Sequence, residues 1–459
     1  MSVALDRRPG ARPVAATTQP ADIARFAGWC FAAFIIFTAI YYHSRTADPG
    51  VRFAIRNGTI TDYGPSWWDQ QKFGQFTPGD LAVIAFAYIG AVARLSSRRT
   101  RLQTRTAVLI GLGVVVVTLG VAVGLLNETP SPFGDWRYLA IGLLFAFGLW
   151  STIIRTERDC FRFAQIFVTI MVIYGIDQLM NYAKGGGEIA FYGRTTSGDH
   201  ATLEFMVAAV GISMAMLRTR RTRFLWMCGI AVGTAVVILA FRRYAWVELA
   251  TVFGAFVMLS GGNRRRYLMS IAAVGAVGIV TVALTWSALD WGSRLASLDP
   301  TQTRAENVYA TTNQGHIDDI LDGWDQVRAN PVTGLGVGVL YHPTRSATWK
   351  GEAGMVHNAP IEVWIKFGIL GVIIFFATYF ILFRDIWRRR RRGRVSDLLA
   401  FGGGAFLLGN FVVICTVYPW AFSTWEKGIL IFSLIAIAYP PGWRSALPAT
   451  TTTTDPASS

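Results

Sequence analysis

Residues 360–394 read PIEVWIKFGILGVIIFFATYFILFRDIWRRRRRGR, an apolar run that ends in a cluster of arginines. A bilayer core requires about 20 mostly apolar residues per helix, so the run predicts a membrane-spanning helix. Proline is favoured in the first helical turn, which places the start of this helix at Pro360. Short cytoplasmic loops are rich in Lys and Arg, so the arginines predict that the helix ends in the cytoplasm.

The same pattern recurs along the 459 residues, of which 53% are apolar and only 15% charged. An ordinary soluble domain carries roughly a quarter charged residues, so the composition argues against a set of soluble domains. We therefore expect an all-α polytopic membrane protein with about twelve transmembrane helices. The twelve apolar runs are 25–42, 79–95, 106–126, 136–154, 161–182, 201–217, 224–240, 245–260, 267–286, 360–383, 397–414 and 427–440.

The net charge of +15 raises the question of nucleic acid binding. Of the 43 Lys and Arg residues, 27 fall in alternate breaks between the apolar runs, and all 27 are arginines. This alternation predicts that both termini are cytoplasmic. An arginine run directly after a membrane helix, such as 388–392, ordinarily anchors the topology and contacts anionic lipid headgroups. Membrane lipids are therefore the expected partner of these charges, and nucleic acid is not.

The remaining segments complete the predicted organisation. Residues 1–24 and 441–459 are rich in Pro, Ala and Thr, which predicts disordered cytoplasmic ends. Residues 25–286 would hold transmembrane helices one to nine, and residues 360–440 helices ten to twelve. Residues 287–359 form a large, partly helical external loop between helices nine and ten. Because eleven apolar runs follow the first one, that first helix is expected to be an uncleaved signal anchor.

The four cysteines are widely scattered and show no CxxC or His-Cys spacing. Neither a disulfide framework nor a zinc site is therefore expected, and no cofactor is predicted. The cysteines are Cys30, Cys160, Cys228 and Cys415.

The external loop carries signs of order. Apolar residues recur at helical spacing with aspartates between them, which predicts a short amphipathic helix ending at Asn330-Pro331. The glycines of the following stretch, centred on Gly336, predict a flexible turn that lets the backbone approach something closely. The apolar positions of the helix are Ile317, Ile320, Leu321, Trp324 and Val327, and the polar ones are Asp318, Asp319, Asp322 and Asp325.

His357 and Asn358 directly precede the helix that starts at Pro360. The partial positive charge of a helix N-terminus disfavours protonation of a nearby imidazole, so His357 would be neutral and able to accept a proton. Alternatively, the two residues form a capping pair that satisfies backbone groups of the loop. The local sequence favours neither interpretation.

Three arginines lie on the side that normally lacks positive charge. Arg194 is in the loop after the fifth apolar run, and Arg242 and Arg243 are in the short turn after the seventh. A phosphate or pyrophosphate ligand would explain them, because its oxygens match the fork of the guanidinium group. Contact with lipid headgroups is the alternative for Arg242 and Arg243.

These motifs together resemble the O-antigen ligase and polymerase family of bacterial membrane glycosyltransferases. The resemblance covers roughly residues 190–385. It is carried by NPVTGLGVG at residues 330–338, by His357-Asn358, by GILG at residues 368–371, and by the upstream Gly193-Arg194 and Arg243-Tyr244-Ala245.

The resemblance implies a metal-independent, inverting glycosyl transfer at the periplasmic face of the inner membrane. The donor would be a glycan on undecaprenyl pyrophosphate, and the acceptor a sugar hydroxyl, usually of lipid A-core. By the same resemblance, Arg194 and Arg243 would hold the pyrophosphate, and His357 would orient or deprotonate the acceptor hydroxyl. The expected residues of the wider substrate site are Arg242, Asn358, His200 and Gly336.

Two departures from the family pattern affect these roles. The second arginine of the family usually follows a serine, whereas here Arg242 precedes Arg243, so either of the two could act. The region around Asp199-His200 also differs, which leaves His200 as a second candidate base.

Two other functions are compatible with the sequence. A polymerase of O-antigen or exopolysaccharide repeat units would use the same donor and fold. A lipid-linked sugar transporter would be expected to carry charged residues inside the spans and to consist of two related halves. Few charged candidates occur inside the runs, among them Asp177 and Glu204, and there is no internal repeat. The long outer loop favours an enzyme.

Overall fold

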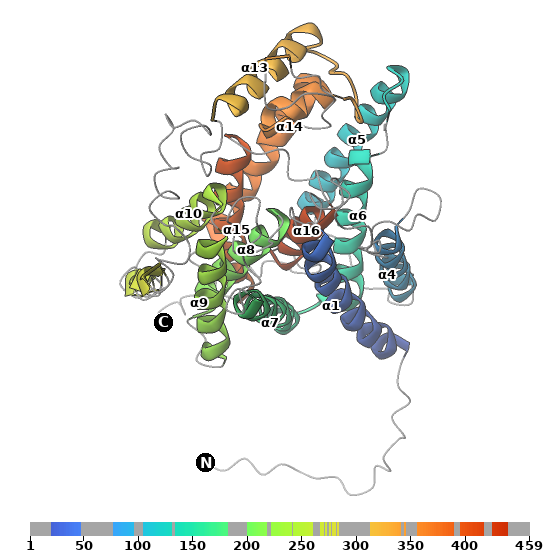
Figure 1. Cartoon of the computed structure of the whole chain (residues 1–459). Helices are drawn as coiled ribbons and strands as arrows, with labels where there is room; N and C mark the ends of the chain where they lie inside the picture. Colours follow the sequence, from blue (N-terminus) through green and yellow to red (C-terminus); the bar gives the residue numbers. More distant parts are fainter. Residues whose placement is uncertain are drawn as a thin grey trace, which may run out of the picture.

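A computed structural model shows a bundle of helices (Figure 1). The residues that it describes are helical or lie in short turns, with no strand among them, which agrees with the predicted all-helical class. The described residues are 20–46, 77–95, 104–130, 134–181, 200–217, 222–240, 242–259, parts of 267–283, 313–340, 344–345, 356–389, 395–416 and 425–438.

All the helices except α13 overlap the predicted apolar runs, because each run is long enough to satisfy its backbone hydrogen bonds as a helix. The ninth run, 267–286, is described only in part and is helical where it is described. The helices are α1 (Pro20–Thr46), α4 (Pro78–Leu95), α5 (Thr104–Leu126), α6 (Gly134–Gly148) with the π-helix η1 (Leu149–Ile153), α7 (Glu157–Asn181), α8 (His200–Met216), α9 (Arg223–Leu239), α10 (Arg243–Leu259), α13 (Asn313–Ala329), α14 (Ala359–Arg389), α15 (Val395–Ile414) and α16 (Trp425–Ala438).

Four of the described helices are long and apolar enough to cross a membrane. They contain the stretches Ile23–Ile40, Glu157–Met180, Ala359–Arg389 and Val395–Ile414. Five shorter apolar helices accompany them within the described part of the chain. The protein is therefore a membrane protein, while a total of twelve crossings stays a prediction.

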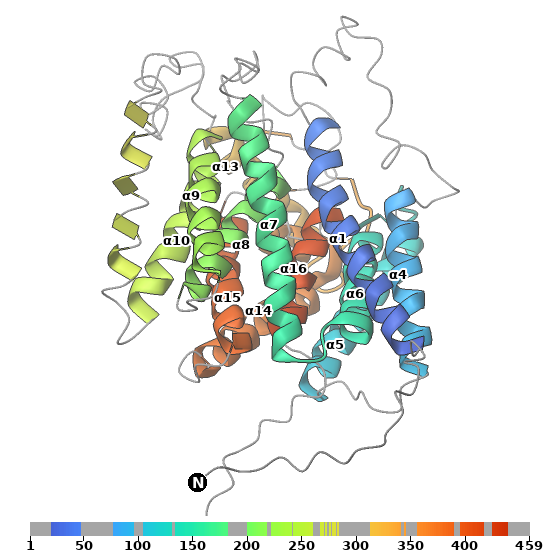
Figure 2. The same cartoon turned by 90° about the horizontal axis from the view of Figure 1, so that it is seen from below.

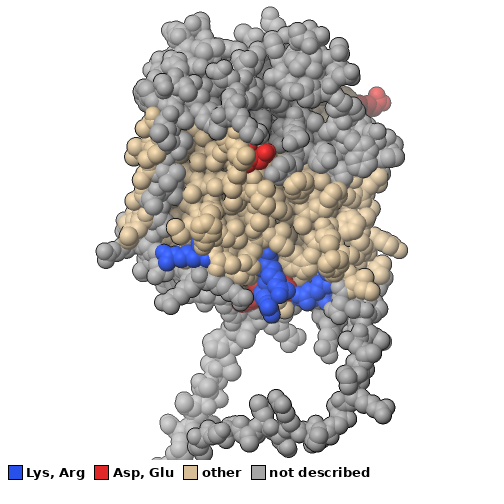
Figure 3. Space-filling view, turned by 60° about the horizontal axis from the view of Figure 1, so that its bottom comes forward, with Lys and Arg blue, Asp and Glu red and all other residues tan. Residues whose placement is uncertain are grey.

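Arginine side chains lie close to one another at one end of the bundle. Arg25 at the start of α1 pairs with Asp159 at the start of α7. Arg389 near the end of α14 lies 2.6 Å from Asp397 at the start of α15, and it also donates to the carbonyl of Ala438 at the end of α16. Figure 3 shows Lys and Arg side chains along one edge of the described surface. Arg25 and Arg389 both belong to the breaks that the sequence predicts to be cytoplasmic, and that orientation stays a prediction.

Helix α15 lies at the centre of the bundle. It contacts α7, α8, α10, α14 and α16, while α9 and α10 lie on one side of it and α1, α4 and α6 on the other (Figures 1 and 2). Close helix contacts in membranes rely on small residues. Gly402 of α15 faces Gly211 of α8 so closely that a Cβ on either would lie 2.7 Å from the carbonyl oxygen of the other. The two glycines therefore allow α15 to pack closely against α8 at the centre of the bundle.

Candidate active site

His357 and Asp319 form the first element of the site. The backbone N–H of His357 donates to Oδ2 of Asp319 at 2.7 Å, and Nδ1 of the imidazole lies 3.0 Å from the same oxygen. The Asp319 side chain is only 3% exposed, whereas that of His357 is 21% exposed. A carboxylate at Nδ1 favours the tautomer with its proton there, which leaves Nε2 able to accept a proton. A carboxylate that contacts both the ring and the backbone of a histidine in this way fixes the orientation of the imidazole.

Helix α13, which carries Asp319, is the amphipathic helix predicted in the loop, and it ends at Ala329, directly before Asn330-Pro331. Its burial differs from the simple expectation. Asp319 and Asp322 are buried, whereas Ile317 is 50% exposed and Leu321 45% exposed. The buried side of the helix therefore combines two of the four aspartates with the apolar Val327, which is 2% exposed, and it is Asp319 on this side that contacts His357.

Asp322 can be buried because backbone and side-chain donors surround it. Its carboxylate accepts hydrogen bonds from the N–H groups of Thr344 and Arg345, both at 2.9 Å, and from the hydroxyl of Thr344 at 2.7 Å. A buried carboxylate is tolerated when its oxygens are satisfied in this way. Asp322 thereby holds the loop at residues 344–345 against α13.

Asn358 caps helix α14 and ties it to α15. Its Oδ1 accepts from the N–H of Ile361 at 3.1 Å, and its Nδ2 donates to the carbonyl of Cys415 at 2.9 Å. The capping alternative therefore describes the contacts of Asn358, while His357 contacts Asp319. A role of Asn358 in substrate binding stays a prediction.

The glycine turn after α13 is packed against the chain itself. Gly334, Gly336 and Gly338 have φ angles of +67°, +91° and +81°, a region that favours glycine. At Gly336 a Cβ would lie 2.1 Å from the backbone nitrogen of Gly124 in α5. The N–H of Val337 donates to the carbonyl of Gly120 at 3.0 Å. The close approach predicted for this turn is thus made to α5, and a contact of Gly336 with substrate stays a prediction.

Gly368 interrupts α14 where the same turn meets it. Its φ of +63° and ψ of −166° are not helical, and a Cβ there would lie 2.0 Å from the carbonyl oxygen of Val332. The N–H of Ile369 donates to the carbonyl of Pro331 at 3.2 Å, and that of Leu335 to the carbonyl of Ile365 at 2.6 Å. The kink and the turn therefore fix each other, and they hold α13 beside the start of α14.

Arg243 and Arg242 differ in their surroundings. The carbonyl of Arg242 accepts from the N–H groups of Ala245 and Trp246 at 3.1 and 3.2 Å, so Arg242 occupies the cap position of α10. Arg243 is the first residue of that helix, and its side chain is half-buried. Its buried Nη2 has no hydrogen-bond partner within the described part of the chain. Buried donors normally have a partner, so Arg243 is the better placed of the two to meet an anionic ligand.

The structure describes no side chain for two other predicted site residues. Arg194 lies outside the described residues. His200 is the first residue of α8, and the structure describes only its backbone. Their positions relative to His357 and Arg243 stay predictions.

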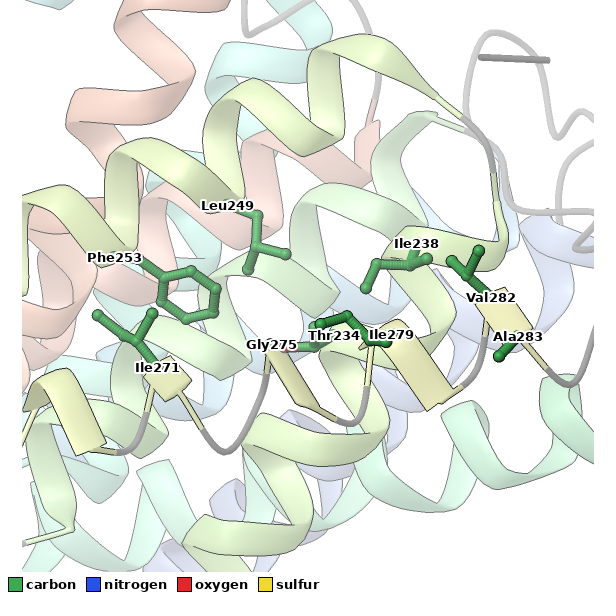
Figure 4. A pocket seen from close by; sticks show the side chains of 10 residues that line it. Thr234, Ile238, Leu249, Phe253, Ile271, Gly275, Ile279, Val282 and Ala283 are labelled. Atoms are coloured by element: carbon green, nitrogen blue, oxygen red, sulfur yellow. The ribbon is translucent and has the colours of Figure 1, made fainter. Parts of the chain in front are cut away.

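An apolar groove lies beside α10. It has a volume of about 580 Å³ and is bordered by α9, α10 and the helical residues between 271 and 283. Figure 4 shows Leu249 and Phe253 of α10 opposite Ile271 and Gly275. Among the residues that line it, only Thr234 carries a polar side-chain atom. Because α10 begins at Arg243, one helix presents a cation at its start and an apolar wall further along.

The described residues contain no group of three or more His, Cys, Asp or Glu side chains that could hold a metal ion. The metal independence expected from the resemblance stays a prediction.

The fold and the site together define a class: a helical membrane protein that has a histidine–aspartate pair and a half-buried arginine at the start of another helix. Residues 229–376 match the family model described as O-antigen ligase, which supports the assignment of the chain to the O-antigen ligase family. The match contains most of α9, all of α10 and α13, and the first part of α14. The resemblance seen in the motifs is thus confirmed. No curated protein matches the chain.

The sequence reasoning missed Asp319 as a site residue. It placed this aspartate on a polar face of the loop helix with three others, and nothing in the spacing distinguishes the four. The sequence indicated only that the external loop carrying Asp319 leads to the helix that follows His357.

Proposed function

We propose that the protein transfers a glycan from an undecaprenyl-pyrophosphate carrier to a sugar hydroxyl of a lipid A-core type acceptor, at the periplasmic face of the bacterial inner membrane. The family match supports glycan transfer in the synthesis of lipopolysaccharide or a related polysaccharide. The observation that carries the proposal within this chain is the contact of His357 with Asp319.

His357 would act as the general base. Its Nε2 takes the proton of the acceptor hydroxyl while the hydroxyl oxygen attacks the anomeric carbon of the donor sugar. The bond between that carbon and the pyrophosphate oxygen breaks in the same displacement, so the configuration at the carbon inverts. Asp319 stabilises the imidazolium that forms and keeps the ring oriented.

Arg243, together with Arg194, would hold the pyrophosphate leaving group. Negative charge increases on the bridging oxygen as the sugar departs, and guanidinium groups placed there lower the energy of the transition state. Arg243 supports this role because its buried Nη2 lacks a hydrogen-bond partner among the described residues. In the same proposal, Arg242, His200, Asn358 and Gly336 belong to the wider substrate site.

The apolar groove beside α10 would receive part of the undecaprenyl chain. A pyrophosphate at Arg243 would leave the isoprenoid chain close to a helix whose Leu249 and Phe253 line the groove. Gly275→Trp would fill the groove and is expected to raise the KM for the undecaprenyl donor. The KM for a short-chain analogue of the donor should rise much less. An equal rise in KM for both donors would exclude the groove as the binding site of the undecaprenyl chain.

The experiment that tests the function uses a deletion strain complemented with the wild-type gene, His357→Ala or Asp319→Asn. Lipopolysaccharide and secreted polysaccharide are separated on gels, and the amount of each protein in the membrane is measured. We expect only the wild-type gene to restore glycan attachment. Restored attachment with His357→Ala would contradict the proposed base. A deletion strain that still attaches single repeat units to lipid A-core would indicate a polymerase instead.

A transporter of lipid-linked sugar is the second candidate, because ionisable side chains are buried inside the bundle. Glu204, Glu248 and Lys427 are each at most 1% exposed. Charged groups inside membrane helices often mark transport pathways. Purified protein in liposomes separates the two functions. Movement of lipid-linked sugar across the bilayer without transfer to an acceptor would support the transporter and contradict the transferase.

A further inference from the structure

Glu248 of α10 and Asn410 of α15 form a buried pair that the proposed chemistry does not use. Their side chains are 0% and 1% exposed. Nδ2 of Asn410 donates to Oε1 of Glu248 at 3.1 Å. The two other oxygens of the pair, Oε2 of Glu248 and Oδ1 of Asn410, are buried and have no hydrogen-bond partner in the described part of the chain. Buried oxygens of this kind require an explanation.

Protonation of Glu248 would explain why these two oxygens are buried without another partner among the described residues. A neutral carboxyl group carries an O–H that can donate to Oδ1 of Asn410, so the two side chains would close a ring of two hydrogen bonds. The neighbouring charges agree with a neutral Glu248. The only ammonium group described nearby, that of Lys427, lies 3.2 Å from Oε1 of Glu204, and both of these residues interact electrostatically with Glu248. One ammonium cannot balance two buried carboxylates, and an unbalanced buried charge is costly.

The pair joins the helix that begins at Arg243 to the helix whose end contacts Asn358. Glu248 comes five residues after Arg243, which corresponds to about 7 Å along a helix axis. Asn410 comes five residues before Cys415, whose carbonyl accepts the hydrogen bond from Asn358, the neighbour of His357. The N–H of Cys415 bonds to the carbonyl of Phe411, so Cys415 continues the helical geometry of α15.

Gly409 makes the contact between α10 and α15 possible. A Cβ at this position would lie 2.9 Å from the carbonyl oxygen of Glu248 and 3.0 Å from its Cα. The Glu248–Asn410 hydrogen bond joins the same two helices beside this contact, so the two together restrict how α10 lies along α15. A helix that carries Arg243 is thereby fixed relative to the helix that supports His357.

We propose that Glu248 and Asn410, as a neutral carboxylic acid–carboxamide pair, are positioning residues that hold Arg243 and His357 at the separation required for glycosyl transfer. The inference rests on the proposed function. It adds that the leaving-group site lies at the start of α10 and the base directly before α14, and that the two are aligned through α15. Neither side chain of the pair touches substrate in this arrangement.

The test uses the full-length protein in lipid nanodiscs. The donor is the undecaprenyl-pyrophosphate-linked glycan that accumulates in the deletion strain, and the acceptor is lipopolysaccharide from that strain. Asn410→Leu and Glu248→Met each remove the pair with little change in size, and Glu248→Gln keeps both hydrogen bonds without a charge. We expect kcat to fall about 100-fold for the first two at a nearly unchanged KM for the donor, since a displacement of about 1 Å can have this effect. Glu248→Gln should stay close to the wild type.

A double variant separates positioning from stability. In Glu248→Met/Asn410→Leu no polar group is left without a partner, so the melting temperature should return toward that of the wild type. The kcat should remain low, because the directional contact is still missing. Recovery of kcat together with stability would overturn the proposal, and so would loss of activity in Glu248→Gln. If the wild-type protein transfers no glycan in this assay, the proposed function fails, and if His357→Ala retains transfer, the proposed base fails. If His357→Ala is inactive while Asn410→Leu keeps the wild-type kcat, only the positioning role fails.

Discussion

Nδ1 of His357 lies 3.0 Å from Oδ2 of Asp319, although the two residues are 38 positions apart. The same oxygen accepts the backbone N–H of His357, so the carboxylate fixes both the ring and the main chain. A histidine held in this way can present Nε2 to a substrate in one orientation. This relationship leads to the first prediction.

Asp319→Asn should reduce transfer strongly without removing the protein from the membrane. An amide at this position can bind the wrong tautomer of the imidazole, and a change of this kind costs about 10²- to 10⁴-fold in rate in enzymes with a similar pair. Initial rates with purified protein measure the effect. Asp318→Asn, the adjacent half-buried carboxylate on the same helix, serves as the matched control and should retain activity. Equal losses in both variants would point to damage to α13 and not to the histidine.

Arg243→Ala should impair use of the donor more than Arg242→Ala does. The guanidinium of Arg243 has a buried nitrogen without a partner among the described residues, whereas Arg242 occupies the cap position of α10 through its backbone. Loss of a charge-assisted bond to pyrophosphate is expected to reduce kcat/KM at least tenfold, since such a bond contributes about 1.5–3 kcal/mol. Donor titrations at saturating acceptor give the comparison. A larger effect of Arg242→Ala would reverse the assignment of the two arginines.

Gly368→Ala should destabilise the protein. The backbone at this residue has a φ of +63°, and the added methyl group would collide with the carbonyl of Val332. We expect the free energy of unfolding to decrease by about 3 kcal/mol, which combines backbone strain with a steric clash. Thermal unfolding in detergent measures the change. Gly111→Ala in α5 is the control, because a Cβ there meets no atom within 4 Å. Similar melting temperatures for both variants would contradict the tight fit at the kink.

The predicted topology can be tested with single cysteines in a variant that lacks the four native ones. Gly351→Cys lies in the loop predicted to be external, and Gly393→Cys lies in the arginine cluster predicted to be cytoplasmic. An impermeant thiol reagent should label the first in intact spheroplasts and the second only after the membrane is opened. Labelling of the second in intact cells would reverse the orientation. This outcome would also exclude periplasmic chemistry at His357.

Much of the fold follows from local patterns. The run 360–383 appears within α14, and α13 ends at Ala329, directly before Asn330-Pro331. These agreements have a simple cause. The helix ends depend on residues next to one another in the chain, and the apolar length depends on the bilayer.

The burial of α13 was not predictable from the same patterns. A helix with apolar and acidic sides is expected to bury the apolar side, yet Asp319 and Asp322 are buried while Ile317 and Leu321 are half-exposed. The reason lies in donors from other segments. The backbone at residues 344–345 and at His357 supplies N–H groups that satisfy the two carboxylates. The pattern of a single helix contains no information about such partners.

The sequence by itself determined that this chain forms membrane helices, which ends of them are rich in arginine, and which motifs resemble those of O-antigen ligases. Only the tertiary structure decided which acid orients His357 and which amide meets Glu248, a contact that spans 162 positions. The physical reason is the same in both cases. Hydrophobic runs and basic loops act through the surrounding lipid and water, whereas a hydrogen bond between distant residues exists only after the helices that carry them have packed.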